Sequence, residues 1–122
     1  MNLSRKNAER LFAFLVFVLL VGTQMSGAWR DAVQDAILPG WGLSSAAHLV
    51  LFAAMALLAR VPPLQRSVVR IGVEGLALAL LTEGLQFFAV DRHPSWTDVG
   101  IDLSGIVIGL LLARLWNSKT RA

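Results

Sequence analysis

Residues 36–59 read AILPGWGLSSAAHLVLFAAMALLA, a run of 24 residues that contains no Asp, Glu, Lys or Arg. A helix needs roughly 17–25 mostly apolar residues to cross the hydrocarbon core of a bilayer, so this run is long enough. The whole chain of 122 residues is 56% hydrophobic and 16% charged, whereas a soluble domain is about a quarter charged. The composition therefore predicts a membrane protein rather than a soluble or disordered chain.

Three further apolar stretches flank this run. Residues 11–29 carry no charge, residues 71–90 contain two charged residues, and residues 99–113 contain one. With short extensions at their ends, each reaches the length of a membrane span. The sequence therefore predicts a single all-α domain, residues 1–122, built as an integral membrane bundle of four transmembrane helices near residues 10–28, 43–60, 68–90 and 98–116.

The basic residues predict the orientation of the bundle, because Lys and Arg concentrate on the cytoplasmic side of membrane proteins. Nine of the 11 lie in three segments, as Arg5, Lys6 and Arg10, then Arg60, Arg66 and Arg70, then Arg114, Lys119 and Arg121. Only Arg30 and Arg92 lie in the two other connections. We therefore expect both termini to be cytoplasmic and residues 29–42 and 91–97 to form outward-facing loops.

The first apolar segment has a second interpretation. Arg5, Lys6 and Arg10 followed by an apolar block are also typical of a secretory signal, with Ser26-Gly27-Ala28 as the cleavage site. The chain has no cysteine, which excludes disulfides and thiolate metal sites. Its basic residues are explained by topology. We therefore expect the lipid bilayer as a partner, with no nucleic acid, no metal and no cofactor.

Polar residues inside the third predicted span share one helix face. Gly72, Gly75, Ala79, Glu83 and Gln86 are spaced 3, 4, 4 and 3 residues apart, which places them on one narrow stripe. The glycines are expected to let a neighbouring helix approach closely. Ionisable groups within a membrane are costly and usually functional. Glu83 is therefore either a functional carboxyl or one that is satisfied within a packing contact.

The fourth predicted span repeats this design. Asp98, Asp102, Gly105 and Gly109 are spaced 4, 3 and 4 residues apart, again on one face. Gly105 and Gly109 form a GxxxG packing motif. Asp98 has an alternative role in the first helical turn, where the helix dipole favours a negative charge. Asp102 lies one turn deeper and is the stronger candidate for a functional site.

Two other residues complete the predicted site. His48 lies about one turn from the outer end of the second span, and Arg92 lies in an outer loop. The spacing and depth of the polar residues predict that they converge at the outer membrane boundary. The predicted site comprises His48, Glu83, Gln86, Arg92, Asp98 and Asp102. Glu74 lies near the cytoplasmic end and is expected to pair with Arg70 or to extend toward water.

The order of these residues resembles that of the VanZ-like family of small membrane proteins. The chain carries an H-x-x-x-F motif at His48 and Phe52, followed by E-x-x-Q at Glu83 and Gln86. Next come R-x-x-S-x-x-D at Arg92, Ser95 and Asp98, and G-x-x-x-G at Gly105 and Gly109. The array covers roughly half of the chain. Two positions depart from the family pattern. Asp102 stands where the family usually has Asn, and Ser44-Ser45 stand where it often has Asp-Lys.

The resemblance implies a multi-pass protein of the bacterial inner (plasma) membrane. It implies a role in cell-envelope physiology or in resistance to glycopeptide antibiotics of the teicoplanin type. The polar site would then bind a lipid or glycolipid headgroup, such as a lipid-linked saccharide or a lipoglycopeptide, with Arg92 at a phosphate.

Two alternatives remain. One is an integral-membrane enzyme for a lipid-linked phosphate or glycoside, in which His48 and Glu83 form a base–acid pair. The other is a small proton-coupled transporter. No acid lies in residues 11–29, where such transporters usually place one, and this disfavours the transporter.

Overall fold

The computed structural model describes residues 3–24, 27–37, 43–86, 88 and 96–121. Within these residues the structure is all-helical, without a strand, which confirms the all-α part of the predicted fold class. The five helices are α1 (Arg5–Gln24), α2 (Gly27–Ile37), α3 (Leu43–Arg60), α4 (Val68–Gln86) and α5 (Trp96–Arg121).

The four long helices correspond to the four predicted spans, and the differences lie at their ends. α1 begins at Arg5, five residues before the predicted start. The prediction began the span after the charged residues, and so it left out the basic first turn of the helix. The Ser4 hydroxyl accepts a hydrogen bond of 3.1 Å from the backbone N–H of Asn7 and so caps this helix. The Ser67 hydroxyl caps α4 in the same way at Arg70.

The helix α2 was not predicted. We expected residues 29–42 to form a loop, and this expectation is wrong for the part within Gly27–Ile37, which is helical. Its sequence is amphipathic, with Trp29 and Val33 on one face and Asp31 and Asp35 on the opposite face. A search for long uncharged runs does not detect such a helix, because its charges recur every four residues.

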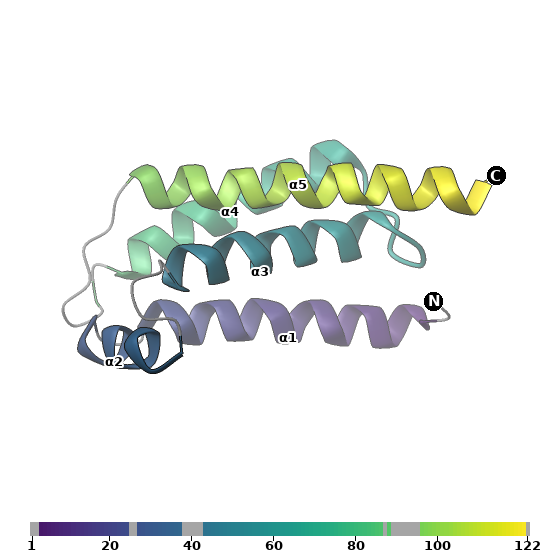
Figure 1. The fold of residues 1–122 in the computed structure, drawn as a ribbon. Helices are drawn as coiled ribbons and strands as arrows, with labels where there is room; N and C mark the ends of the chain where they lie inside the picture. Colours follow the sequence, from purple (N-terminus) through teal and green to yellow (C-terminus); the bar gives the residue numbers. More distant parts are fainter. Residues whose placement is uncertain (1–2, 25–26, 38–42, 87, 89–95, 122) are drawn as a thin grey trace.

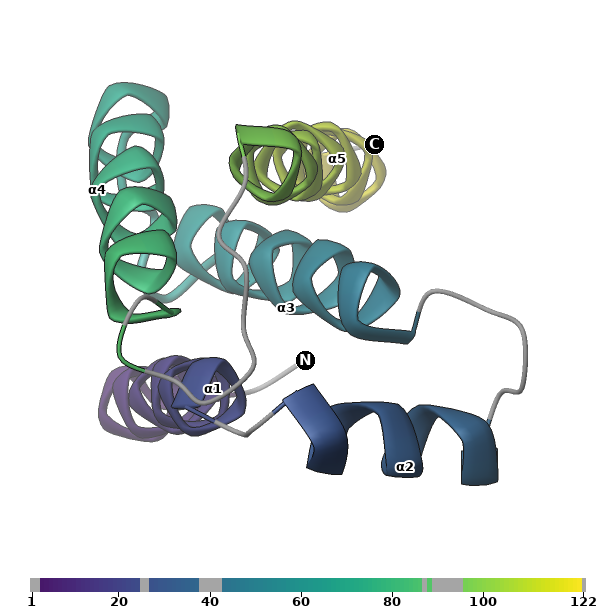
Figure 2. The ribbon, with the colours of Figure 1, turned by 90° about the vertical axis from the view of Figure 1, so that its left-hand side faces the viewer.

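The long helices extend between the two ends of the bundle, with α3 and α4 tilted relative to α1 and α5 (Figures 1 and 2), and both chain termini lie at the same end. We call this the terminal end. At the opposite end, which we call the α2 end, α2 crosses the bundle axis, and Figure 2 shows it lengthwise while α1 and α5 are viewed along their axes. The first residues of α3 and α5 and the last residues of α4 also lie at the α2 end.

The core of the bundle forms around α3. Phe52, Met55 and Ala56 of α3 are buried together with Leu19 of α1 and Ile106 of α5. The most extensive contact between two helices joins α3 and α5. α3 is therefore the central helix, which explains why residues 43–60 are the most uniformly apolar part of the chain.

Two glycines of α5 create the close α3–α5 contact. A Cβ atom placed on Gly105 would lie 2.6 Å from the carbonyl oxygen of Leu49. One placed on Gly109 would collide with the carbonyl oxygen of Ala53. Backbone atoms cannot rotate away as a side chain can, so only glycine fits at these positions. The GxxxG motif thus packs α5 against α3 within one chain.

The two glycines predicted to pack on α4 have different surroundings. A Cβ atom on Gly75 would meet the side chain of Ile106 on α5, so this position does contact another helix. A Cβ atom on Gly72 would meet no described atom within 4 Å. Gly72 therefore makes no close helix contact within the described residues, although it lies near Gly75 on the same face.

Much of the outward surface of the long helices is apolar. The exposed large apolar side chains on these four helices are Leu11, Phe14, Phe17, Val18, Val21, Val50, Val68, Val69, Val73, Leu76, Leu80, Leu81, Trp96, Val107, Ile108, Leu111, Leu112, Leu115 and Trp116. Exposed apolar patches this extensive are rare on soluble monomers.

By length and hydropathy, one helix in the described part of the chain, Trp96–Lys119, is long and apolar enough to cross a membrane. Ser45–Arg60 is apolar but shorter. α1 carries four charges in its first six residues. α4 contains Arg70, Glu74 and Glu83, and these charges lower its hydropathy.

Candidate functional site

A buried histidine–aspartate pair joins α3 to α5. Nδ1 of His48 lies 2.9 Å from Oδ1 of Asp102, a hydrogen-bonding distance. The Asp102 side chain is 0% exposed and that of His48 is 12% exposed. A carboxylate oxygen accepts from Nδ1–H, and in a neutral imidazole with this tautomer Nε2 is the acceptor nitrogen. The sequence predicted both residues as part of one site, and the structure brings them into contact.

The surrounding residues hold this pair in place. The His48 ring stacks on Phe52, one turn further along α3, with their centroids 6.5 Å apart. Gly105, one turn after Asp102 on α5, lets the two backbones approach at Leu49. The hydrogen bond between His48 and Asp102 therefore depends on the small residue Gly105, three positions after Asp102.

The second carboxylate oxygen of Asp102 has no hydrogen-bond partner among the described residues. Oδ2 is buried and makes no such bond there. A buried polar atom without a partner costs about 1–3 kcal/mol, and more if it is charged. An oxygen of this kind is the natural acceptor for a hydroxyl or amide of a bound molecule or for an ordered water.

α4 contributes three buried polar side chains near the α2 end. Thr82, Glu83 and Gln86 are 0%, 8% and 2% exposed. The Thr82 hydroxyl donates a 2.9 Å hydrogen bond to the carbonyl of Ala79. The sequence analysis missed Thr82. Its position four residues before Gln86, next to Glu83, is the signal that could have identified it.

The remaining predicted residues are placed differently. Asp98 is half-buried in the first turn of α5, the position expected of a residue stabilised by the helix dipole. Because Asp102 follows it by four residues, the two acids share a helix face. Arg92 lies outside the described residues, so its predicted role stays a prediction.

The hydrogen bond that the structure shows on the His48 imidazole is with Asp102. The base–acid pairing of His48 with Glu83, considered for an enzyme, stays a prediction. Spacing along α4 indicated which face Glu83 occupies. It could not show how α4 and α5 are rotated about α3.

No family model, curated protein or solved structure matches this chain.

The polar groups of this site can donate and accept hydrogen bonds. Within the described residues, no group of three or more His, Asp, Glu or Cys side chains could hold a metal ion. The His48 imidazole and the buried Asp102 carboxylate offer a donor and acceptors inside an apolar bundle. Such a pair can bind hydroxyls or amides. A histidine oriented by a carboxylate can also accept a proton from a substrate.

Proposed function

We propose that this protein is a multi-pass membrane protein of the VanZ-like type whose polar site binds the headgroup of an envelope lipid or glycolipid. The observation that carries the proposal is the buried His48–Asp102 pair in a bundle whose outward faces are apolar. Ionisable groups in such surroundings usually mark a ligand or ion pathway.

Three features support four membrane spans. The apolar residues on the outer faces of the long helices provide the surface that lipid requires. Trp96 and Trp116 are separated by 20 residues of α5, or about 30 Å at 1.5 Å per residue, which matches the hydrocarbon thickness. Tryptophan is enriched at both interfaces. Both termini lie at one end, as an even number of spans requires.

The position of α2 is consistent with this arrangement. It lies across the bundle axis at one end (Figures 1 and 2). Amphipathic helices that lie in the membrane interface have this orientation. Trp29 on its apolar face is 68% exposed. We infer that this face rests on the outer leaflet.

The absence of native cysteine allows a direct test of topology. Single cysteines introduced as Ser4→Cys, Asp35→Cys, Gln65→Cys and Ser118→Cys are labelled in intact bacteria with a maleimide that cannot cross membranes. We expect labelling of Asp35→Cys only, and labelling of all four after permeabilisation. Labelling of Gln65→Cys or Ser118→Cys in intact cells would contradict the four-span topology. Loss of the Ser4→Cys label from a shortened mature protein would favour the cleaved-signal interpretation.

The headgroup proposal predicts that position 102 needs a hydrogen-bonding side chain rather than a charge. Asp102→Asn keeps an oxygen acceptor for His48 and adds an N–H donor in place of Oδ2. We expect this variant to retain its co-purified headgroup-bearing lipid and its function in a null strain. We expect Asp102→Leu to lose both by about tenfold or more, as for a site deprived of a buried polar contact.

The measurements are mass spectrometry of lipids extracted from the purified protein and complementation scored by envelope phenotype and glycopeptide susceptibility. Asp35→Leu, an exposed substitution on α2, is the matched control and should behave as wild type. Glu83→Gln and Arg92→Ala test the other predicted contacts. Full lipid retention by Asp102→Leu at normal expression would contradict the proposal, and full retention by Arg92→Ala would contradict the phosphate contact.

An enzyme is the second candidate, and the orientation of His48 by Asp102 favours it. With Nδ1 bound to the carboxylate, Nε2 could act as a general base, as in histidine–aspartate pairs of hydrolases. This mechanism needs the carboxylate. Asp102→Asn would then lose turnover by several orders of magnitude while still binding lipid. A variant that binds lipid but fails to complement would therefore favour the enzyme.

A further inference from the structure

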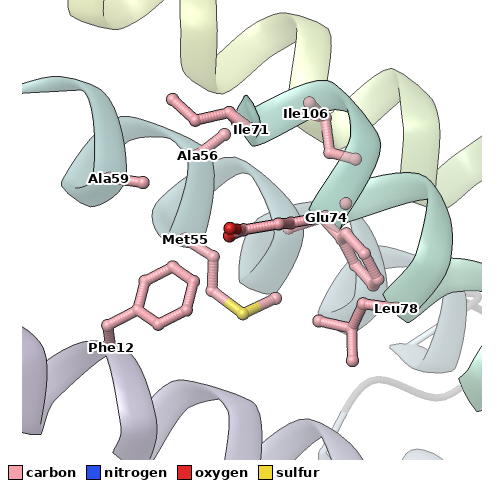
Figure 3. Close-up of a pocket in the computed structure, with 10 residues that line it drawn as sticks. Phe12, Met55, Ala56, Ala59, Ile71, Glu74, Leu78 and Ile106 are labelled. Carbon is pink, nitrogen blue, oxygen red and sulfur yellow. The ribbon is translucent and has the colours of Figure 1, made fainter. Parts of the chain in front are cut away.

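A second candidate site lies closer to the terminal end. A cavity of about 190 Å³, open on one side, is lined by residues of α1, α3, α4 and α5. Figure 3 shows Phe12, Met55 and Leu78 around it, with the Glu74 carboxylate directed toward the space between them. The other lining residues are Phe52, Ala56, Ala59, Ile71, Gly75 and Ile106. Among the described residues of this lining, Glu74 alone is charged.

The walls of the cavity favour an apolar guest. An engineered cavity of about 150 Å³ lined by Leu, Ile and Phe stays dry and binds apolar molecules. Water in this cavity would find few polar partners besides the Glu74 carboxylate, and each buried water needs two to four. The guest is therefore expected to be a hydrocarbon chain rather than a sugar or a free ion.

A cluster of basic groups borders the same cavity. The Arg66 guanidinium lies over the Phe12 ring, 4.6 Å from its centroid. It also lies 3.4 Å from Glu74, and Nε of Arg70 lies 2.6 Å from the same carboxylate. Nη1 of Arg60 donates to the Arg66 carbonyl at 3.0 Å. Two guanidinium groups thus contact one carboxylate, and with Arg60 beside them the cluster carries an excess positive charge.

From this combination we propose that the cavity holds part of one acyl chain of an anionic phospholipid, with the lipid phosphate at Arg66 and Arg70. An apolar cavity beside excess positive charge complements an amphiphile with a negative headgroup. Basic pockets between helices on the cytoplasmic side of membranes bind such lipids. The Arg66–Phe12 contact fits this role, since it places a cation at the boundary between the apolar walls and the charged cluster. The proposal rests on the membrane orientation proposed above, and it does not depend on the His48–Asp102 site.

Native mass spectrometry of the full chain in detergent tests this proposal. The protein is titrated with phosphatidylglycerol or with phosphatidylcholine of identical acyl chains. We expect phosphatidylglycerol to bind the wild type more tightly. Arg66→Gln should weaken phosphatidylglycerol binding by about fivefold, the effect of removing one basic residue near a lipid surface. Lys119→Gln, a charge change on the exposed end of α5, should leave it unchanged.

A matched pair of substitutions tests the cavity itself. Leu78→Phe directs a larger side chain into the cavity, whereas Leu81→Phe makes the same change on the exposed face of α4. We expect Leu78→Phe to reduce binding of both lipids and Leu81→Phe to reduce neither. Equal wild-type affinity for the two lipids would overturn the proposal. So would unchanged binding by Leu78→Phe. The wild-type comparison and Arg66→Gln do not depend on whether Leu78→Phe folds.

Discussion

Replacing Gly109 by alanine is expected to destabilise the bundle by about 1–3 kcal/mol, the range found when a well-packed contact is overfilled. A Cβ atom here would collide with the carbonyl oxygen of Ala53 and lie 2.8 Å from the Cβ of Ala56. Since the first of these atoms is backbone, α3 and α5 must move apart to accommodate it. That movement would also stretch the hydrogen bond of Asp102, which lies two turns away on the same face of α5.

Gly100 provides the matched control on the same helix. A Cβ atom placed there meets no described atom within 4 Å. Alanine is favoured over glycine in an exposed helix by about 1 kcal/mol. The two chemically identical substitutions are therefore expected to change the free energy of unfolding in opposite directions. Titration with sodium dodecyl sulfate in mixed micelles, followed by circular dichroism, measures both. Equal effects of the two variants would show that α5 does not pack against α3 through Gly109.

Replacing His48 by leucine is expected to cost about 1–3 kcal/mol or more, the penalty for leaving a buried carboxylate oxygen without its hydrogen-bond partner. The Asp102 side chain is 0% exposed, and it forms a hydrogen bond with His48. Without the imidazole, the carboxylate would remain buried in an apolar contact. Ser45→Leu, an exposed change one turn earlier on α3, is the control and should leave stability nearly unchanged.

A double-mutant cycle separates the pair from its surroundings. The variant with both His48→Leu and Asp102→Leu removes the polar groups together, and such replacements are often neutral or stabilising. We therefore expect the double variant to be more stable than His48→Leu alone. Additive losses in the cycle, measured by the same titration, would show that the two side chains do not interact.

The helical segments were largely predictable because their signal is local. The long apolar runs predicted four long helices, and the start of α1 moved to the cap at Ser4 because the basic first turn is also helical. The amphipathic helix α2 was missed for the opposite reason. Its charges at Asp31 and Asp35 break every uncharged window, yet their spacing is helical.

The composition of the candidate site was predictable in part. Helical spacing alone placed Glu83 with Gln86 on one face, and Asp102 with Gly105 on another. Thr82 was missed because a hydroxyl in an apolar helix carries little signal when it can bond to its own backbone, as it does at Ala79. Gly72 was included because it continues the stripe, although no described helix comes close to it.

The sequence by itself determined the helical fold class, the apolar character of the helices and the polar residues that each face carries. These properties follow from periodicity, which acts within one helix. Only the tertiary structure decided that His48 bonds to Asp102, that Gly105 and Gly109 pack on α3, and that Arg66 borders an apolar cavity. Contacts of this kind depend on the tilt and rotation of two helices about each other. The side chains of both helices determine these jointly, so neither segment specifies them alone.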